Sequence, residues 1–136
     1  MSQGNVELVR EHVKAFLAKD TRRANAFLDP HVVWDGSRTA GVETGNVTYG
    51  TQQLDDFVRS YRGAFDRFDW NIHDFVELGP GVVLGLVTET GYGRQSGVPV
   101  DRSYALVYLI LDRKIVRITL FPSEDEARAA VGHVGH

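Results

Sequence analysis

The chain has 136 residues, of which 43% are hydrophobic and 24% are charged, a composition typical of one compact globular domain. Its formal net charge of −3 supplies no positive field to attract phosphates, so a nucleic-acid partner is not expected. The absence of cysteine excludes disulfides, thiol nucleophiles and thiolate metal ligands.

The N-terminal segment lacks a basic head followed by an apolar stretch, so we predict no signal peptide. The longest apolar run, residues 104–111, is too short to cross a bilayer. We therefore expect a cytoplasmic protein without a membrane partner, folded as a single domain over residues 1–136.

Apolar residues recur at three- and four-residue steps from Val6 to Leu17, which predicts an amphipathic helix. A second, short helix is expected to start at Asp20 or Thr21. It should end at Asp29-Pro30, because the residue before a proline avoids the helical conformation. A buried strand over residues 31–35 follows.

Residues 36–50 contain four glycines and little periodicity, which predicts a long loop that could hold a short hairpin. Thr51 is the expected N-cap of a third helix, whose buried stripe runs from Leu54 to Phe65.

The period then changes, and short turns separate four apolar segments, as in an antiparallel meander. The predicted strands are 68–78, 82–93, 98–111 and 114–121. Ser123, with Glu126 three residues later, predicts the capping box of a closing helix. Helices and antiparallel strands that are segregated along the chain indicate an α+β fold.

Four stretches carry a family resemblance: FLDPHVVWDG, VTYGTQQLDDFVRSYRGAFDRF, GRQSGVPVDRSYALVYLILDRKIVRI and PSEDEARAA. On these stretches, and in its element order, the chain resembles the nuclear transport factor 2-like superfamily from about Val6 to Ala130. Within it, the chain resembles the SnoaL-like, ketosteroid-isomerase-like small proteins. The resemblance implies a cone-shaped, curved antiparallel sheet wrapped around three N-terminal helices, with an apolar pocket inside the cone.

The resemblance also implies where catalytic groups would lie. The general-base aspartate of ketosteroid isomerases corresponds to Asp35, at the end of the first strand. A second aspartate of the isomerases, or a histidine of SnoaL-like cyclases, corresponds to Leu106. An aspartate of the cyclases and of limonene-epoxide-type hydrolases corresponds to Leu120. These two leucines make the expected pocket more apolar and disfavour the known chemistries of these relatives.

Two interpretations of Asp35 follow from its neighbours. Asp-Gly favours a turn, in which the carboxylate stays in water. Alternation, however, places Asp35 on the side of Val33 and opposite Trp34, so its side chain could also point into the cone. Burial there would raise its pKa and suit it to act as a general base. We predict the second placement.

Glu89 is the second catalytic candidate, because a carboxylate in a central strand is unusual unless it is paired. Arg102 or Arg94 could pair with it inside the cone, and a cross-strand ion pair on the outer face is equally compatible with the pattern. Arg102 could also bind a ligand carboxylate, and Tyr104 could donate to a developing oxyanion. The alternative is an exposed charge and a core aromatic.

Large aromatic side chains either line the pocket or fill the core, and the candidates are Trp34, Tyr49, Tyr61, Phe65 and Trp70. The histidines show no metal-ligand spacing, so no metal or other cofactor is expected. His12 lies beside the apolar stripe of the first helix, near the place where isomerase relatives carry a catalytic tyrosine. A partly buried structural role is the favoured interpretation for it.

We predict a small cofactor-free enzyme that acts on an apolar metabolite by acid–base chemistry, of the isomerase, cyclase or epoxide-hydrolase type. The alternative is a non-catalytic small-molecule-binding module or a dimeric interaction domain of the same fold. Residues 104–111 are apolar on both faces, so we expect a homodimer. Its contact face would carry Val107, Leu109, Leu111 and Phe121.

Overall fold

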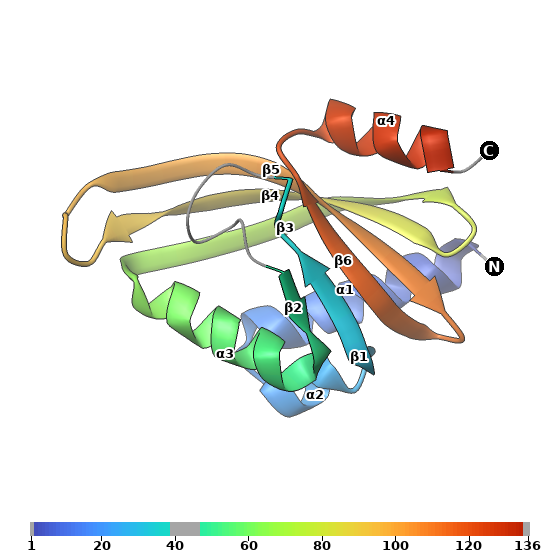
Figure 1. Cartoon of the computed structure of the whole chain (residues 1–136), viewed down its shortest axis with the longest axis horizontal. Coiled ribbons are helices and arrows are strands. Elements are labelled where there is room, and N and C mark those ends of the chain that lie inside the picture. Colours follow the sequence, from blue (N-terminus) through green and yellow to red (C-terminus); the bar gives the residue numbers. More distant parts are fainter. Residues whose placement is uncertain (1, 39–46, 135–136) are drawn as a thin grey trace.

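The computed structural model describes residues 2–38 and 47–134, which form an α+β fold (Figure 1). The helices are α1 (Ser2–Leu17), α2 (Thr21–Asn25), α3 (Gly50–Gly63) and α4 (Glu124–Val134). The strands are β1 (Leu28–Asp35), β2 (Val47–Tyr49), β3 (Phe65–Gly79), β4 (Val82–Gly93), β5 (Pro99–Leu111) and β6 (Lys114–Phe121).

The strands form one six-stranded sheet in the order β2-β1-β6-β5-β4-β3. Long strands β3 to β6 make the predicted antiparallel meander. β1 pairs antiparallel with β2 but parallel with β6, which differs from the all-antiparallel expectation. No hairpin joins β1 to β6, since α3 and the meander separate them, and their relative direction is therefore free of turn constraints.

Figure 1 shows α1, α2 and α3 on the concave side of the curved sheet and α4 on the opposite side. The main core lies between the concave face and the helices. Val9 and Val13 of α1 meet Val87 of β4 and Leu106 of β5 there, all nearly inaccessible to water. The three-and-four spacing of the helix and the alternation of the strands thus bury their apolar sides against each other.

Helix α4 covers part of the outer face of the sheet. Ala127 packs with Leu84, Val107 and Phe121 in a second apolar cluster. The predicted helix start is confirmed, because the Ser123 hydroxyl oxygen accepts a hydrogen bond from the Glu126 backbone N–H at 3.2 Å. The outer face of β5 therefore has a partner within its own chain.

The beginning of the chain differs from prediction in two places. α2 ends at Asn25, and Asp29-Pro30 lies within β1 rather than stopping a helix. The proline is accommodated because the β1–β6 register is interrupted between Leu28 and Val33.

The start of α3 also differs from prediction. Tyr49, not Thr51, is its N-cap, and Gln53 Oε1 accepts a hydrogen bond from the Tyr49 backbone N–H at 2.9 Å. Of the predicted loop, residues 39–46 lie outside the described residues, and Val47–Tyr49 pairs with β1.

Over the described ranges, 2–38 and 47–134, no helix is both long and apolar enough to span a membrane.

Candidate functional site

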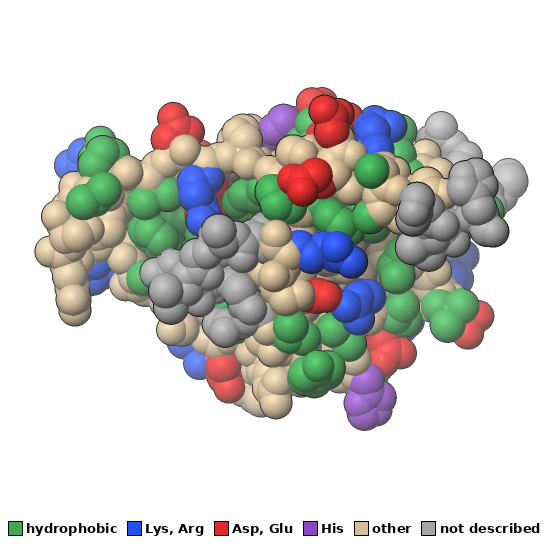
Figure 2. All heavy atoms as spheres, turned by 45° about the horizontal axis from the view of Figure 1, so that its top comes forward, with side chains coloured by type: hydrophobic (Ala, Val, Ile, Leu, Met, Phe, Trp, Pro, Cys, Tyr) green, Lys and Arg blue, Asp and Glu red, His purple; other side chains and the backbone are tan. Residues whose placement is uncertain are grey.

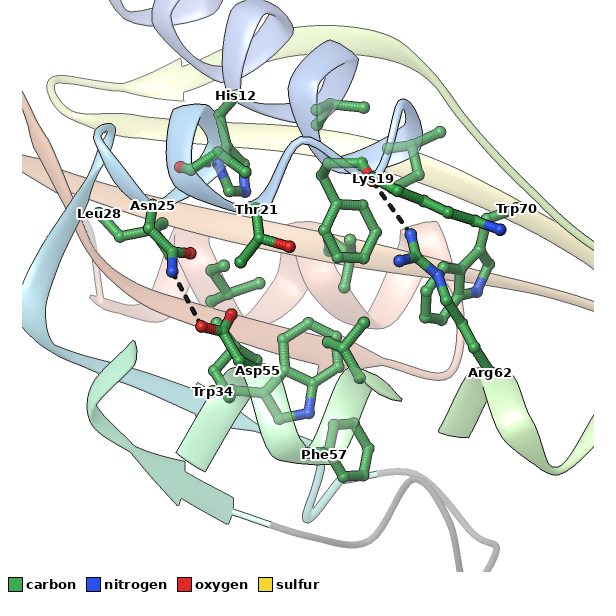
Figure 3. Close-up of a pocket in the computed structure, with 18 of the residues that line it drawn as sticks. His12, Lys19, Thr21, Asn25, Leu28, Trp34, Asp55, Phe57, Arg62 and Trp70 are labelled. Atoms are coloured by element: carbon green, nitrogen blue, oxygen red, sulfur yellow. Dashed lines mark hydrogen bonds between the residues drawn. The ribbon is translucent and has the colours of Figure 1, made fainter. Parts of the chain in front are cut away.

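A cavity of about 290 Å³ lies between the concave face of the sheet and helices α1 to α3 (Figure 3). Aliphatic and aromatic side chains make up most of its wall. Of the residues proposed from the sequence, Trp34, Trp70, Tyr104 and Leu106 line it. A cavity of roughly 150 Å³ can hold benzene, so this one has room for a molecule of about two rings.

The other candidate pocket residues lie elsewhere. Tyr61, Phe65 and Leu120 pack in the protein without lining the cavity. Tyr49 is 64% exposed at the end of the short edge strand β2.

Asp35 lies on the opposite side of the sheet, so the prediction that it points into the cone is wrong. It borders a second cavity, of about 730 Å³, together with Arg38 and Arg117. Figure 2 shows basic and acidic side chains meeting in a hollow on the face that carries α4. Alternation correctly separates Asp35 from Trp34, but Trp34 is the residue that lines the cone. A strand pattern gives relative facing and not which face is internal.

The Asp35 carboxylate is already bonded. Its Oδ1 accepts from the Ser37 backbone N–H at 3.0 Å and from the Ser37 hydroxyl at 2.5 Å, and its Oδ2 pairs with Arg117 at 2.5 Å. The Ser37 hydroxyl above all lowers the pKa of Asp35; burial opposes it, while the Ser37 amide and Arg117 lower the pKa further. A carboxylate with these partners is a weak base near neutral pH.

Glu89 is fully buried at the centre of a hydrogen-bonded cluster. Its Oε1 accepts from Trp70 Nε1 and from the Tyr104 hydroxyl, each at 2.7 Å. Its Oε2 accepts from the Tyr61 hydroxyl at 2.5 Å and pairs with an Arg102 nitrogen at 2.9 Å. Both oxygens are occupied by protein donors, and Glu89 itself does not line the cavity.

The predicted pairing of Glu89 with Arg102 is confirmed, since the two residues are directly opposite on β4 and β5. Arg94 instead pairs with Asp66 at 3.1 Å. Burial, and then the charge of Glu89, raise the pKa of Tyr104 far above its usual value. The Tyr104 hydroxyl thus stays protonated and donates to Glu89, so it is not available to an oxyanion.

His12 contributes a ring to the cavity wall and is 6% exposed. Its Nδ1 lies 2.9 Å from the Ala24 carbonyl oxygen. Because a carbonyl can only accept, Nδ1 carries the proton, and in the neutral ring Nε2 is an acceptor. Burial lowers the pKa of His12 below 6.5, more than the Ala24 carbonyl raises it. His12 is therefore a neutral imidazole at pH 7.

The His12 ring packs against Phe16, Phe27 and Tyr108, with ring centroids 6.3, 6.4 and 6.3 Å away. Tyr108 also lines the cavity, and burial raises its pKa far above the usual value, so its hydroxyl remains a donor. Within residues 2–38 and 47–134, neither His12 Nε2 nor the Tyr108 hydroxyl has a hydrogen-bond partner.

His12 lies within the buried face of α1, whereas the sequence analysis places it beside the apolar stripe. Val9, His12, Val13 and Phe16 follow the i, i+3, i+4, i+7 spacing of a buried helix face, so His12 belongs to the stripe and not beside it. This spacing was the signal that could have placed it inside the cone.

Polar side chains gather at the cavity mouth (Figure 3). Asn25 donates to Asp55 Oδ2 at 3.0 Å, and Lys19 and Arg62 lie at the end nearer Trp70. The described residues contain no group of three or more acidic or histidine side chains placed to hold a metal ion.

The sequence profile of the SnoaL-like domain matches residues 9–118, most of the chain. The chain belongs to the SnoaL-like family. Among the similar solved structures is an NTF2-like protein of unknown function from Burkholderia pseudomallei, 22% identical over 93% of this chain and 95% of that chain, with a TM-score of 0.72.

Two other structures similar to that of this SnoaL-like protein were determined with small molecules. TerC, crystallised with polyporic acid, is 15% identical over 95% of this chain and 98% of that chain, with a TM-score of 0.71. RV0760c from Mycobacterium tuberculosis, in complex with estradiol-17β-hemisuccinate, is 13% identical over 92% and 97%, also with a TM-score of 0.71. At these identities the likeness establishes the fold alone. A comparison with curated proteins finds no match.

The Glu89 cluster predicts a large stability effect. Glu89→Gln removes the charge that Arg102 faces and turns an amide N–H toward side chains that already donate. Breaking a buried pair typically costs about 3–5 kcal/mol. We expect a loss of that size in the free energy of unfolding, measured by urea titration.

The matched control is Glu124→Gln, which breaks a pair with Arg128 whose side chains are 42% and 48% exposed. It should cost less than about 1 kcal/mol. Equal losses for the two variants would contradict a structural role of the Glu89 cluster.

Proposed function

We propose that this SnoaL-like protein is a cofactor-free enzyme that performs acid–base chemistry on an apolar, ring-containing metabolite bound in the cone. The orientation of His12 carries the proposal. The Ala24 carbonyl fixes the proton on Nδ1, and this leaves the Nε2 lone pair on a ring that borders the cavity. Asp35 and Glu89, the bases proposed from sequence, are both held by other protein groups.

His12 and Tyr108 have complementary roles in such a reaction. His12 Nε2 would remove a proton from a carbon beside a ligand carbonyl, while the Tyr108 hydroxyl would donate a hydrogen bond to the carbonyl oxygen as negative charge develops. The imidazolium would then return the proton to another carbon, which completes an isomerisation. In a cyclisation the carbanion would instead attack a second carbonyl, whose oxygen would take the proton.

The apolar wall supports this chemistry in two ways. It excludes water from the developing charge, and it keeps the His12 pKa low enough for the free base to predominate at neutral pH.

A non-catalytic binding module is the second candidate. Leu106 and Leu120 occupy positions where catalytic relatives carry polar groups, and this favours binding without turnover. The small molecules present in TerC and RV0760c are compatible with either function, since both need an open cone.

A substrate-independent test of the base uses 5-nitrobenzisoxazole, an apolar aromatic whose ring opens when a base removes its C–H proton. The wild-type protein should accelerate ring opening beyond the same concentration of free imidazole. His12→Gln should lose about a hundredfold of that acceleration, within the range expected for a positioned base. The rate should rise with pH to a plateau, with its midpoint below 6.5 because burial lowers the pKa of His12.

Two variants control this experiment. His73→Gln alters a histidine that bonds Asp74 away from the cavity and should keep the wild-type rate. Leu106→Trp fills the cavity and should abolish the acceleration. Full activity of His12→Gln would rule out His12 as the base, and binding of the probe without any acceleration would favour the binding module.

We also propose that the chain forms a homodimer through the part of the outer face that α4 leaves uncovered. Leu111 is 63% exposed on β5, next to the apolar cluster that includes Leu109. Light scattering coupled to gel filtration should give twice the chain mass of 15.2 kDa. Leu111→Lys should shift the population toward monomer, because a charge would be desolvated at the interface.

Val98→Lys is the matched control, since Val98 is 58% exposed in the turn between β4 and β5 and should not affect assembly. A wild-type mass of 15.2 kDa at micromolar concentration would contradict the dimer.

A further inference from the structure

Arg62, on the last turn of α3, is a half-buried cation at the cavity mouth. Its guanidinium lies 4.8 Å from the ring centroid of Phe16 and 5.4 Å from that of Trp70, and one nitrogen donates to the Phe16 carbonyl at 3.0 Å. A guanidinium has five N–H donors. In the described part of the chain Arg62 makes no other hydrogen bond and has no carboxylate partner.

Lys19 brings a second cation to the same end of the cavity (Figure 3). It follows α1 with a φ of 61°, a left-handed conformation that turns the chain at the end of the helix. Its backbone N–H bonds the same Phe16 carbonyl that Arg62 contacts, at 3.1 Å. Lys19 also forms no ion pair within residues 2–38 and 47–134.

The described lining also contains one more cation, Arg59, and one carboxylate, Asp55, and neither neutralises these two cations. Arg59 lines the cavity but pairs with Asp56 at 3.3 Å. Among the described lining residues Asp55 is the one carboxylate, and Asn25 bonds it at 3.0 Å on the other side of the opening (Figure 3). Two neighbouring cations beside an apolar wall repel each other, and a bound anion would remove that cost.

We infer that the ligand of this cavity is an amphipathic anion, with an apolar ring body inside the cone and a carboxylate at the mouth bound by Arg62 and Lys19. The carboxylate would accept two parallel hydrogen bonds from the free edge of the Arg62 guanidinium. The inference rests on the proposed function only in that the cone holds a small molecule. It does not require His12 to act as a base.

A structural role for Arg62 makes a different prediction. The contact with the Phe16 carbonyl ties α3 to the C-terminal end of α1, where a positive charge is favourable in itself. If that were its whole role, replacing Arg62 would affect charged and neutral ligands equally.

The test compares naphthalene-2-carboxylate with naphthalene-2-carboxamide, which has nearly the same shape and no charge, by titration calorimetry. The wild-type protein should bind the carboxylate about tenfold more tightly, the typical effect of a charge-assisted hydrogen bond. Arg62→Met keeps an apolar side chain over Trp70 but loses the charge. It should remove that advantage and change carboxamide binding by less than about twofold.

Three further variants separate the contributions. Lys19→Met should weaken carboxylate binding by a smaller factor, because Lys19 is more exposed than Arg62. Arg62→Lys should retain part of the preference, as a single point charge replaces the planar fork. Arg23→Met is the matched control and should leave both affinities unchanged, since Arg23 pairs with Glu11 and does not line the cavity. A sulfonate on the same ring should bind less tightly than the carboxylate, because only the carboxylate has the planar geometry that matches the guanidinium.

Equal wild-type affinity for the carboxylate and the carboxamide would overturn the anion preference while leaving a binding cavity in place. A parallel loss for both ligands in Arg62→Met would assign Arg62 to structure alone and also overturn it. Failure of both ligands to bind the wild-type protein would overturn both this inference and the proposed function.

Discussion

A carboxylate with no access to water must be surrounded by donors, and Glu89 imposes this requirement near the middle of the sheet. Its donors come from three other elements: Tyr61 of α3, Trp70 of β3, and Arg102 and Tyr104 of β5. Meeting all of them fixes α3 against the strands, across the space between the sheet and the helices. The cavity is the part of that space which the cluster does not fill.

The cluster and the cavity therefore differ in their chemistry. Around Glu89 each charge has partners, so the group stabilises one arrangement and offers nothing to a ligand. Along the cavity the pattern is reversed, because in the described part of the chain His12 Nε2 has no partner and Arg62 has donors that no protein group accepts. Polar groups in an apolar wall without partners are costly for folding, and a ligand that supplies those partners recovers that cost. This contrast is why we place the function at His12 rather than at either carboxylate.

Local patterns in the sequence determined much of the fold and little of the site. Turn residues and alternation predicted strands over 82–93 and 114–121, which the structure confirms. The sequence predicted that Glu89 pairs with Arg102 or Arg94, and Arg102 is its partner in the structure. The predicted orientation of the Asp35 side chain is wrong because alternation says which residues share a face but not which face is inside. That depends on how the sheet curves around α1. The role of His12 depends on the Ala24 carbonyl of α2, a tertiary contact that no spacing within α1 encodes.

The proposed chemistry depends most on the protonation state of the His12 imidazole. Nitrogen NMR of His12, assigned with the His12→Gln variant, reports both its tautomer and its pKa. We predict a neutral ring with the proton on Nδ1, titrating below 6.5, because the Ala24 carbonyl holds that proton and burial disfavours the imidazolium. A proton on Nε2, or a pKa at or above 6.5, would contradict the claim that this cone contains a base ready to accept a proton.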